Sequence, residues 1–112
     1  MVKLATKPLN ATFSALADPT RRAILARLAR GEATVSTLAR PYPMSLPAVS
    51  KHLRVLERAG LVQRSRLGRV HLMRLAAGPL RDAREWISDY ERFWQERLDS
   101  LANFLDDPDT AE

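Results

Sequence analysis

The spacing of the apolar residues changes sharply at Gly60, and this change constrains the fold more than any other feature of the chain. Before it, residues 45–59 read SLPAVSKHLRVLERA, and their apolar residues are three, four and three positions apart, at Leu46, Val49, Leu53 and Leu56. This spacing predicts a helix that turns these four side chains inward. Ser45 is its expected N-cap, and Pro47 is tolerated in the first turn.

After Gly60 the segment LVQRSRLGRVHLMRL is strand-like and contains Leu67-Gly68 at a tight turn. It predicts a two-stranded hairpin over residues 62–75. From about residue 79 to residue 105, apolar residues recur again at steps of three and four, which predicts one long helix.

The N-terminal half predicts three shorter helices. The first covers residues 9–17, with Leu9, Phe13 and Leu16 on one side. The second begins at Asp18 as N-cap, with Pro19 in its first position, and Gly31 closes it. The third is short, is capped by either Thr34 or Ser36, and runs through Leu38.

The predicted order is therefore helix, helix, short helix, helix, hairpin and long helix. This mainly α architecture with a small β-hairpin is that of a winged helix-turn-helix. The 112 residues suffice for one domain, which we expect over residues 9–106. A flexible arm is expected over residues 1–8 and an acidic tail over 107–112.

The charge balance indicates a polyanionic partner. The net charge is +5 and the pI is about 10.4, which suits nucleic acid or an anionic membrane surface without choosing between them. The absence of cysteine excludes disulfides, thiolate metal sites and cysteine nucleophiles. No apolar run approaches the roughly 18 residues that span a bilayer. We expect a cytoplasmic protein without a membrane partner.

The helix over 45–59 has an outer face suited to a DNA groove. With the apolar residues inward, Pro47, Lys51 and Arg54 lie on the far side, and Ala48 and Ser50 lie on the flanks. Small residues permit close approach to base edges, and cations can bind bases or phosphates. Three arginines surround the hairpin turn, where they would straddle phosphates: Arg64, Arg66 and Arg69.

Two segments, ADPTRRAILARLARGEATVSTLA and SLPAVSKHLRVLERAGLVQRSRLGRVHLMRL, resemble the ArsR-type bacterial transcriptional repressors over residues 10–105. The resemblance implies a homodimer that binds a palindromic DNA operator through helix 45–59 and the wing 62–75. Together with the outer face of that helix, it gives a set of expected DNA-binding residues: Ser45, Pro47, Ala48, Ser50, Lys51, His52, Arg54, Arg64, Arg66, Gly68 and Arg69.

The long last helix carries more apolar surface than one small domain needs for its own core. Its stripe runs from Leu80 to Leu105, and an exposed stripe of this size would promote aggregation. Pairing with the same surface of a second chain is the usual solution. The expected dimer interface joins the first and last helices through Leu9, Phe13, Ile87, Tyr90, Trp94, Leu98, Leu101 and Leu105.

The chain departs from the metal-sensing members of that family. The segment VSTLARPYP lacks the Cys-x-Cys pair, and the last helix carries no histidine. We therefore expect no metal and no cofactor, and we leave open whether a small-molecule effector exists. No enzyme motif is present. The alternative function is a winged-helix module that binds protein, with its basic face merely solvated.

Overall fold

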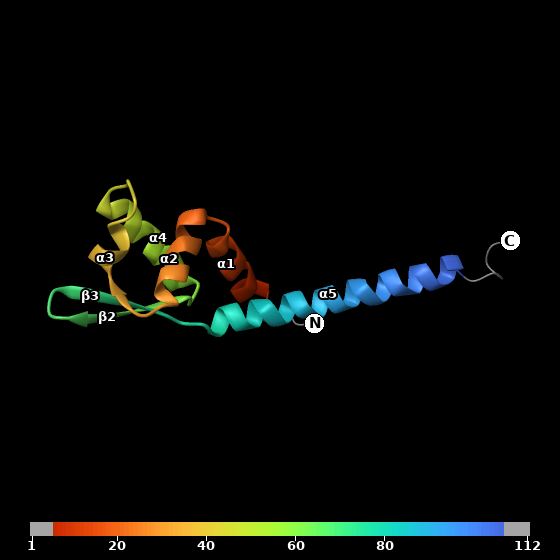
Figure 1. Cartoon of the computed structure of the whole chain (residues 1–112). Helices are drawn as coiled ribbons and strands as arrows, with labels where there is room; N and C mark the ends of the chain where they lie inside the picture. The colour runs from red at the N-terminus through yellow and green to blue at the C-terminus, as the bar shows by residue number, and fades with distance from the viewer. Residues whose placement is uncertain (1–5, 107–112) are drawn as a thin grey trace.

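The computed structural model describes residues 6–106 and has the predicted order of elements (Figure 1). The elements are α1 (Thr6–Leu16), α2 (Pro19–Leu28), β1 (Ala33–Thr34), α3 (Val35–Ala39), α4 (Leu46–Arg58), β2 (Val62–Leu67), β3 (Val70–Leu75) and α5 (Gly78–Asp106). The mainly α architecture with a small hairpin is confirmed. We call residues 6–75 the head and the β2–β3 hairpin the wing.

Side-chain caps start three of the helices where the sequence predicts them. The Asp18 carboxylate accepts from the Arg21 N–H at 3.0 Å, and the Ser45 hydroxyl accepts from the Ala48 N–H at 3.3 Å. For α3 the cap is Thr34 and not Ser36, because the Thr34 hydroxyl accepts from the backbone of Thr37. Each cap satisfies one of the N–H groups that a helix start leaves unpaired.

The first helix starts earlier than predicted. Residues 6–8 belong to α1, so the expected arm over residues 1–8 is wrong at its end. Pro8 is compatible with this earlier start, because a proline is tolerated in the first turn, where its missing N–H has no helical partner. Residues 1–5 of the arm and the acidic tail over 107–112 lie outside the described residues.

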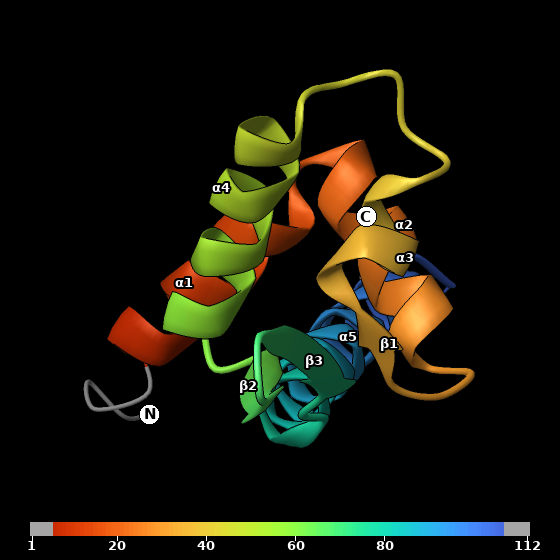
Figure 2. The same cartoon turned by 90° about the vertical axis from the view of Figure 1, so that its left-hand side faces the viewer.

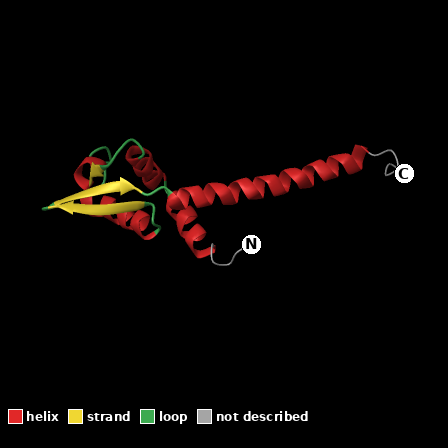
Figure 3. Cartoon of the chain, turned by 90° about the horizontal axis from the view of Figure 1, so that it is seen from below, coloured by secondary structure: helices red, strands yellow, loops and turns green. Residues whose placement is uncertain are grey.

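The wing belongs to a three-stranded antiparallel sheet with the order β1-β3-β2 (Figure 3). Val62 pairs with Leu75 and Leu67 with Val70, so the turn consists of Gly68 and Arg69. Gly68 has φ +63°, a left-handed conformation that glycine adopts at little cost. Strand β1 was not predicted, since two residues are too few to show a period.

The core of the head lies between α2, α3, α4 and the sheet. Its largest fully buried side chains are Ile24, Leu38, Leu53, Leu56, Leu61, Met73 and Val49. The prediction that Leu46 points inward is wrong, because 53% of it is exposed. As the first residue of α4 it lies at the edge of the packed region, one turn before Val49.

Helix α5 leaves the head as an isolated rod (Figure 1). Its 29 residues contribute to overall extents of 74 × 30 × 21 Å, and only Ala83 in it is buried. Its first turns pack against α1, where the rings of Phe13 and Trp86 meet edge to face at 5.8 Å. The rest of the helix has no neighbour among residues 6–106 that covers it.

Candidate nucleic-acid interface

The start of α4 and the wing both lie at the end of the molecule opposite the far end of α5 (Figure 1), and α4 runs from its start toward the wing (Figure 2). A groove of about 450 Å³ joins them, and α3 forms its third side. Predicted residues from three elements line it together: Ser50 of α4, Arg64 of β2 and Arg69 of the turn. Its other lining residues are Thr34, Val35, Ser36, Leu46, Val70 and His71.

The outer face of α4 is accessible, as predicted. Ser45, Pro47, Lys51 and Arg54 are exposed, whereas Ala48, Ser50 and His52 are partly buried. The helix therefore presents a hydroxyl, small side chains and cations on one surface. Leu46 adds an exposed apolar side chain to the first turn.

Four predicted cations have no carboxylate partner among residues 6–106. They come from α4 and from the wing, and they are Lys51, Arg54, Arg66 and Arg69. Exposed cations without a protein counter-ion can bind phosphate without first breaking an ion pair.

Arg64 differs from these four because it is already engaged. Its Nη2 and Nε donate to the two carboxylate oxygens of Glu57 at 2.8 and 3.2 Å. These hydrogen bonds raise the pKa of Arg64, and its Nη1 lies 3.2 Å from the Nδ1 of His71. The bidentate pair connects the wing to the last turns of α4. A sequence signal existed, since Glu57 is the only acidic residue between Glu32 and Asp82.

His52 faces α2. Its Nδ1 lies 3.2 Å from Nη1 of Arg21 and 3.8 Å from the carboxylate of Asp18. Arg21 also donates to the carbonyl oxygens of Ala15 and Ser14. The Arg21 N–H and the nearby His52 hold the pKa of Asp18 below its usual value of 3.8. His52 thus helps to fix α4 against α1 and α2.

The residues predicted for the dimer interface form one surface along α5. Ile87, Tyr90, Trp94, Leu98, Leu101 and Leu105 are each 47 to 68% exposed. Trp86 stacks on Tyr90 at 5.1 Å, and Tyr90 meets Trp94 edge to face at 6.0 Å. Leu9 and Phe13 of α1 are partly buried beside the start of this surface. Sequence reasoning left Phe93 and Phe104 out of the set, although both rings are about half exposed.

No group of three or more histidine or acidic side chains among residues 6–106 could ligate a metal ion. None of the helices in this part of the chain combines the length and the apolarity that crossing a membrane requires.

The chain is similar to known transcription regulators. A helix-turn-helix domain model matches residues 16–64. The HTH-type transcriptional regulator Rv2034 of Mycobacterium tuberculosis is 44% identical over 94 residues, which cover 84% of this chain and 85% of that protein. The transcriptional repressor SdpR of Bacillus subtilis is 33% identical over 82 residues, covering 73% of this chain and 91% of that protein.

Solved structures agree with these relatives. The crystal structure of the ArsR family transcriptional regulator RHA00566 superposes with a TM-score of 0.78 at 42% identity, covering 80% of this chain and 93% of that one. The homodimeric winged helix-turn-helix DNA-binding domain Mb0332 of Mycobacterium bovis superposes with a TM-score of 0.62 at 29% identity, with 87% of each chain covered. The chain therefore belongs to the ArsR-type winged helix-turn-helix transcriptional regulators.

Proposed function

We propose that this regulator is a homodimeric repressor that binds a palindromic DNA operator through α4 and the wing. One observation carries the proposal: α4 and the wing share a groove, and four cations without carboxylate partners among residues 6–106 lie on these two elements. The protein acts by binding alone, without catalysis, in the cytoplasm, where operator DNA is accessible.

In this proposal the first turns of α4 enter the major groove. Ala48 and Leu46 supply apolar contact for a thymine methyl group, and Ser50 and Lys51 reach base edges. The positive end of the helix dipole at the start of α4 favours a phosphate there. Arg66 and Arg69 at the wing tip bind phosphates on either side of the groove.

The second half of the proposal is the dimer. The exposed apolar stripe of α5 pairs with the same stripe of a second chain, which removes it from water. A two-fold dimer sets two recognition helices about 34 Å apart, one turn of DNA, so the operator is palindromic. The homodimeric neighbour Mb0332 supports this assembly, and the repressor SdpR supports repression as the outcome.

Selection of bound sequences from a random duplex pool with purified full-length protein tests the proposal. We expect an inverted repeat with half-sites about one turn apart. A dimer that contacts about six to ten phosphates then loses roughly a thousand-fold or more in affinity between about 50 and 200 mM salt. A pool without enrichment and a nearly flat salt response would favour the protein-binding module instead.

A further inference from the structure

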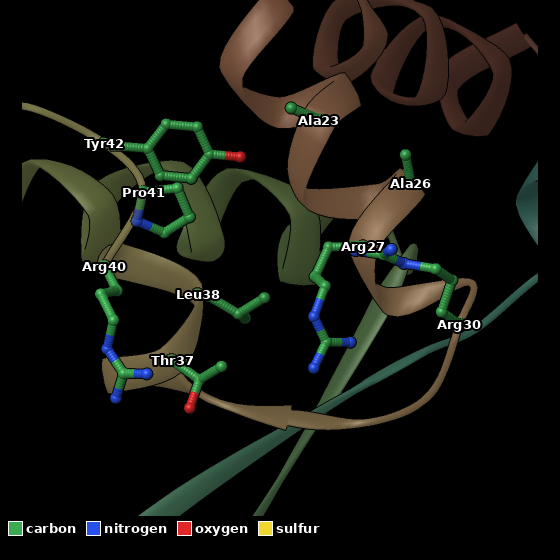
Figure 4. Close-up of a pocket in the computed structure, with 9 residues that line it drawn as sticks. All are labelled: Ala23, Ala26, Arg27, Arg30, Thr37, Leu38, Arg40, Pro41 and Tyr42. Atoms are coloured by element: carbon green, nitrogen blue, oxygen red, sulfur yellow. The ribbon is translucent and has the colours of Figure 1, made fainter.

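The head carries a second cavity that none of the expected DNA-binding residues lines. Its volume is about 830 Å³, within the usual range for small-molecule sites. It lies between α2, α3 and the turn that follows α3 (Figure 4). The residues around it are Ala23, Ala26, Arg27, Arg30, Thr37, Leu38, Arg40, Pro41 and Tyr42.

The floor and two walls of this cavity are apolar. Leu38, itself only 2% exposed, lies at the centre, and the rings of Pro41 and Tyr42 form one wall (Figure 4). On the opposite wall, α2 contributes the small side chains of Ala23 and Ala26. Small side chains on a helix leave room beside its backbone, so this surface suits a compact apolar body.

The rim of the cavity is cationic. Three arginines line it and no acidic side chain does. Arg27 is held in place because its Nη1 donates to the Gly31 carbonyl oxygen at 3.0 Å. Arg30 and Arg40 have no carboxylate partner within the described part of the chain. Such a rim selects an anion, and guanidinium groups bind carboxylates with paired hydrogen bonds.

Thr37 lies at the edge of the cavity between Arg40 and Arg27 (Figure 4). Its hydroxyl oxygen accepts a hydrogen bond from the Thr34 hydroxyl at 3.0 Å and points away from the cavity, so Thr37 offers its methyl group to the lining (Figure 4). The cavity therefore combines an apolar floor with cations at its edge, which is the chemistry of an amphipathic anion site.

We propose that this cavity binds a small organic carboxylate with an apolar body and that the bound carboxylate changes the affinity for DNA. The second part rests on the proposed function. Its physical basis is α3, a helix of five residues that contributes to both sites. Thr37 and Leu38 line the cavity, whereas Val35 and Ser36 line the groove beside α4. A ligand that shifts α3 therefore changes the groove, and the two affinities are coupled.

Calorimetric titration of the full-length protein without DNA tests the binding site. The probes are 2-naphthoate and decanoate, each compared with its uncharged primary amide. We expect saturable binding of the carboxylates and at least about tenfold weaker binding of the amides, as expected when a hydrogen bond between two charged groups is lost. The double variant Arg30→Gln/Arg40→Gln should weaken carboxylate binding by a similar factor. The matched control is Arg84→Gln, an exposed arginine on α5, which should bind as wild type does.

Some calorimetric outcomes would overturn the site. They are equal binding of carboxylate and amide, unchanged binding in the double variant, or no saturable binding up to millimolar concentration. Ala26→Phe supplies a second test, because a ring at this exposed position of α2 fills the cavity without touching the core. It should abolish binding while the unfolding transition stays cooperative.

A DNA-binding titration tests the coupling. With a duplex from the random-pool selection, the carboxylate that binds should shift the DNA midpoint of the wild type and of Arg84→Gln, but not of the double variant. If the double variant without ligand loses DNA affinity and its salt slope falls, then the arginines contact DNA phosphates and the proposed coupling through α3 is wrong. If wild type binds no duplex at all, the proposed function fails, and calorimetry alone decides the carboxylate site.

Discussion

At the residue scale, the Asp18 carboxylate has neighbours on both α2 and α4. It caps α2 through the Arg21 N–H, and it also lies 3.8 Å from His52 of α4. These neighbours favour its charged form and hold its pKa below 3.8. A carboxylate with a lowered folded pKa stabilises the fold above its unfolded pKa, and this contribution is lost as the pH falls through the folded value.

Replacing Asp18 by Asn should separate the cap from the charge. Asn caps helices about as well as Asp but does not titrate. We expect the free energy of unfolding of the wild type to fall more steeply than that of Asp18→Asn below about pH 4. Urea unfolding over an acid pH series measures the free energy of unfolding of both proteins. The other carboxylates titrate alike in the two, so their contribution cancels when one free energy is subtracted from the other. If the free energies of unfolding of the two proteins fell in parallel with pH, the charge on Asp18 would contribute no pH-dependent stability.

The exposed residues of α4 and the wing should have distinguishable roles. Arg66→Ala or Arg69→Ala removes a phosphate contact, so affinity should fall similarly for the selected duplex and for random DNA. Ser50→Ala or Lys51→Ala should instead change the preference among half-sites, by about 1–3 kcal/mol at the affected base. Competition titrations with single-base variants of the selected duplex measure both effects. Equal losses on specific and random DNA in all four variants would refute α4 as the reading helix.

At the scale of elements, one ion pair connects the wing to α4. Glu57 and Arg64 join α4 to β2 with two hydrogen bonds, and their side chains are only 27% and 26% exposed. The pair is thus less screened than a surface pair. By comparison, the pair between Asp89 and Arg92 on α5 is 74% and 65% exposed.

Glu57→Ala should therefore loosen the wing. We expect a loss of about 1 kcal/mol in stability, faster amide hydrogen exchange in β2 and β3, and weaker binding of the selected duplex. Asp89→Ala is the matched control and should change stability by less than about 0.5 kcal/mol, because exposed ion pairs contribute little. If exchange in the wing were the same in both variants, Glu57 would not position it.

At the scale of the whole molecule, α5 makes an isolated chain incomplete. Most of its 29 residues extend beyond the head (Figure 1). Its apolar stripe is about half exposed from Ile87 to Leu105. Aromatic rings add area in the middle of this stripe, where Tyr90 and Trp94 are in contact. Burial of this surface against a second copy gives the free energy for the proposed dimer.

A charge in the stripe should break the dimer and abolish operator binding together. Leu98→Glu and Leu101→Glu place a carboxylate where the partner helix packs, so both should sediment as monomers, although α4 and the wing are unchanged. Asn103→Glu, on the opposite side of α5, should remain a dimer. Sedimentation and DNA titration on the same samples check both readouts. A monomeric wild type with full operator affinity would overturn the assembly.

The sequence by itself determined the features that depend on neighbouring residues. Apolar spacing predicted α2, α4, the wing and α5, and the caps at Asp18 and Ser45 were correct because a cap involves residues only three apart. The outer face of α4 and the apolar stripe of α5 follow from the same periodicity. The predicted roles of their residues in DNA binding and dimerisation stay predictions.

Tertiary structure decided whatever depends on residues distant along the chain. Strand β1 exists only through its pairing with β3, and Leu46 is exposed because the core ends before it. The contact between Arg21 and His52 joins residues 31 positions apart, and no local pattern encodes it. The cavity between α2 and α3 has the same origin, because its cationic rim and apolar floor come from two helices and a turn that only packing brings together.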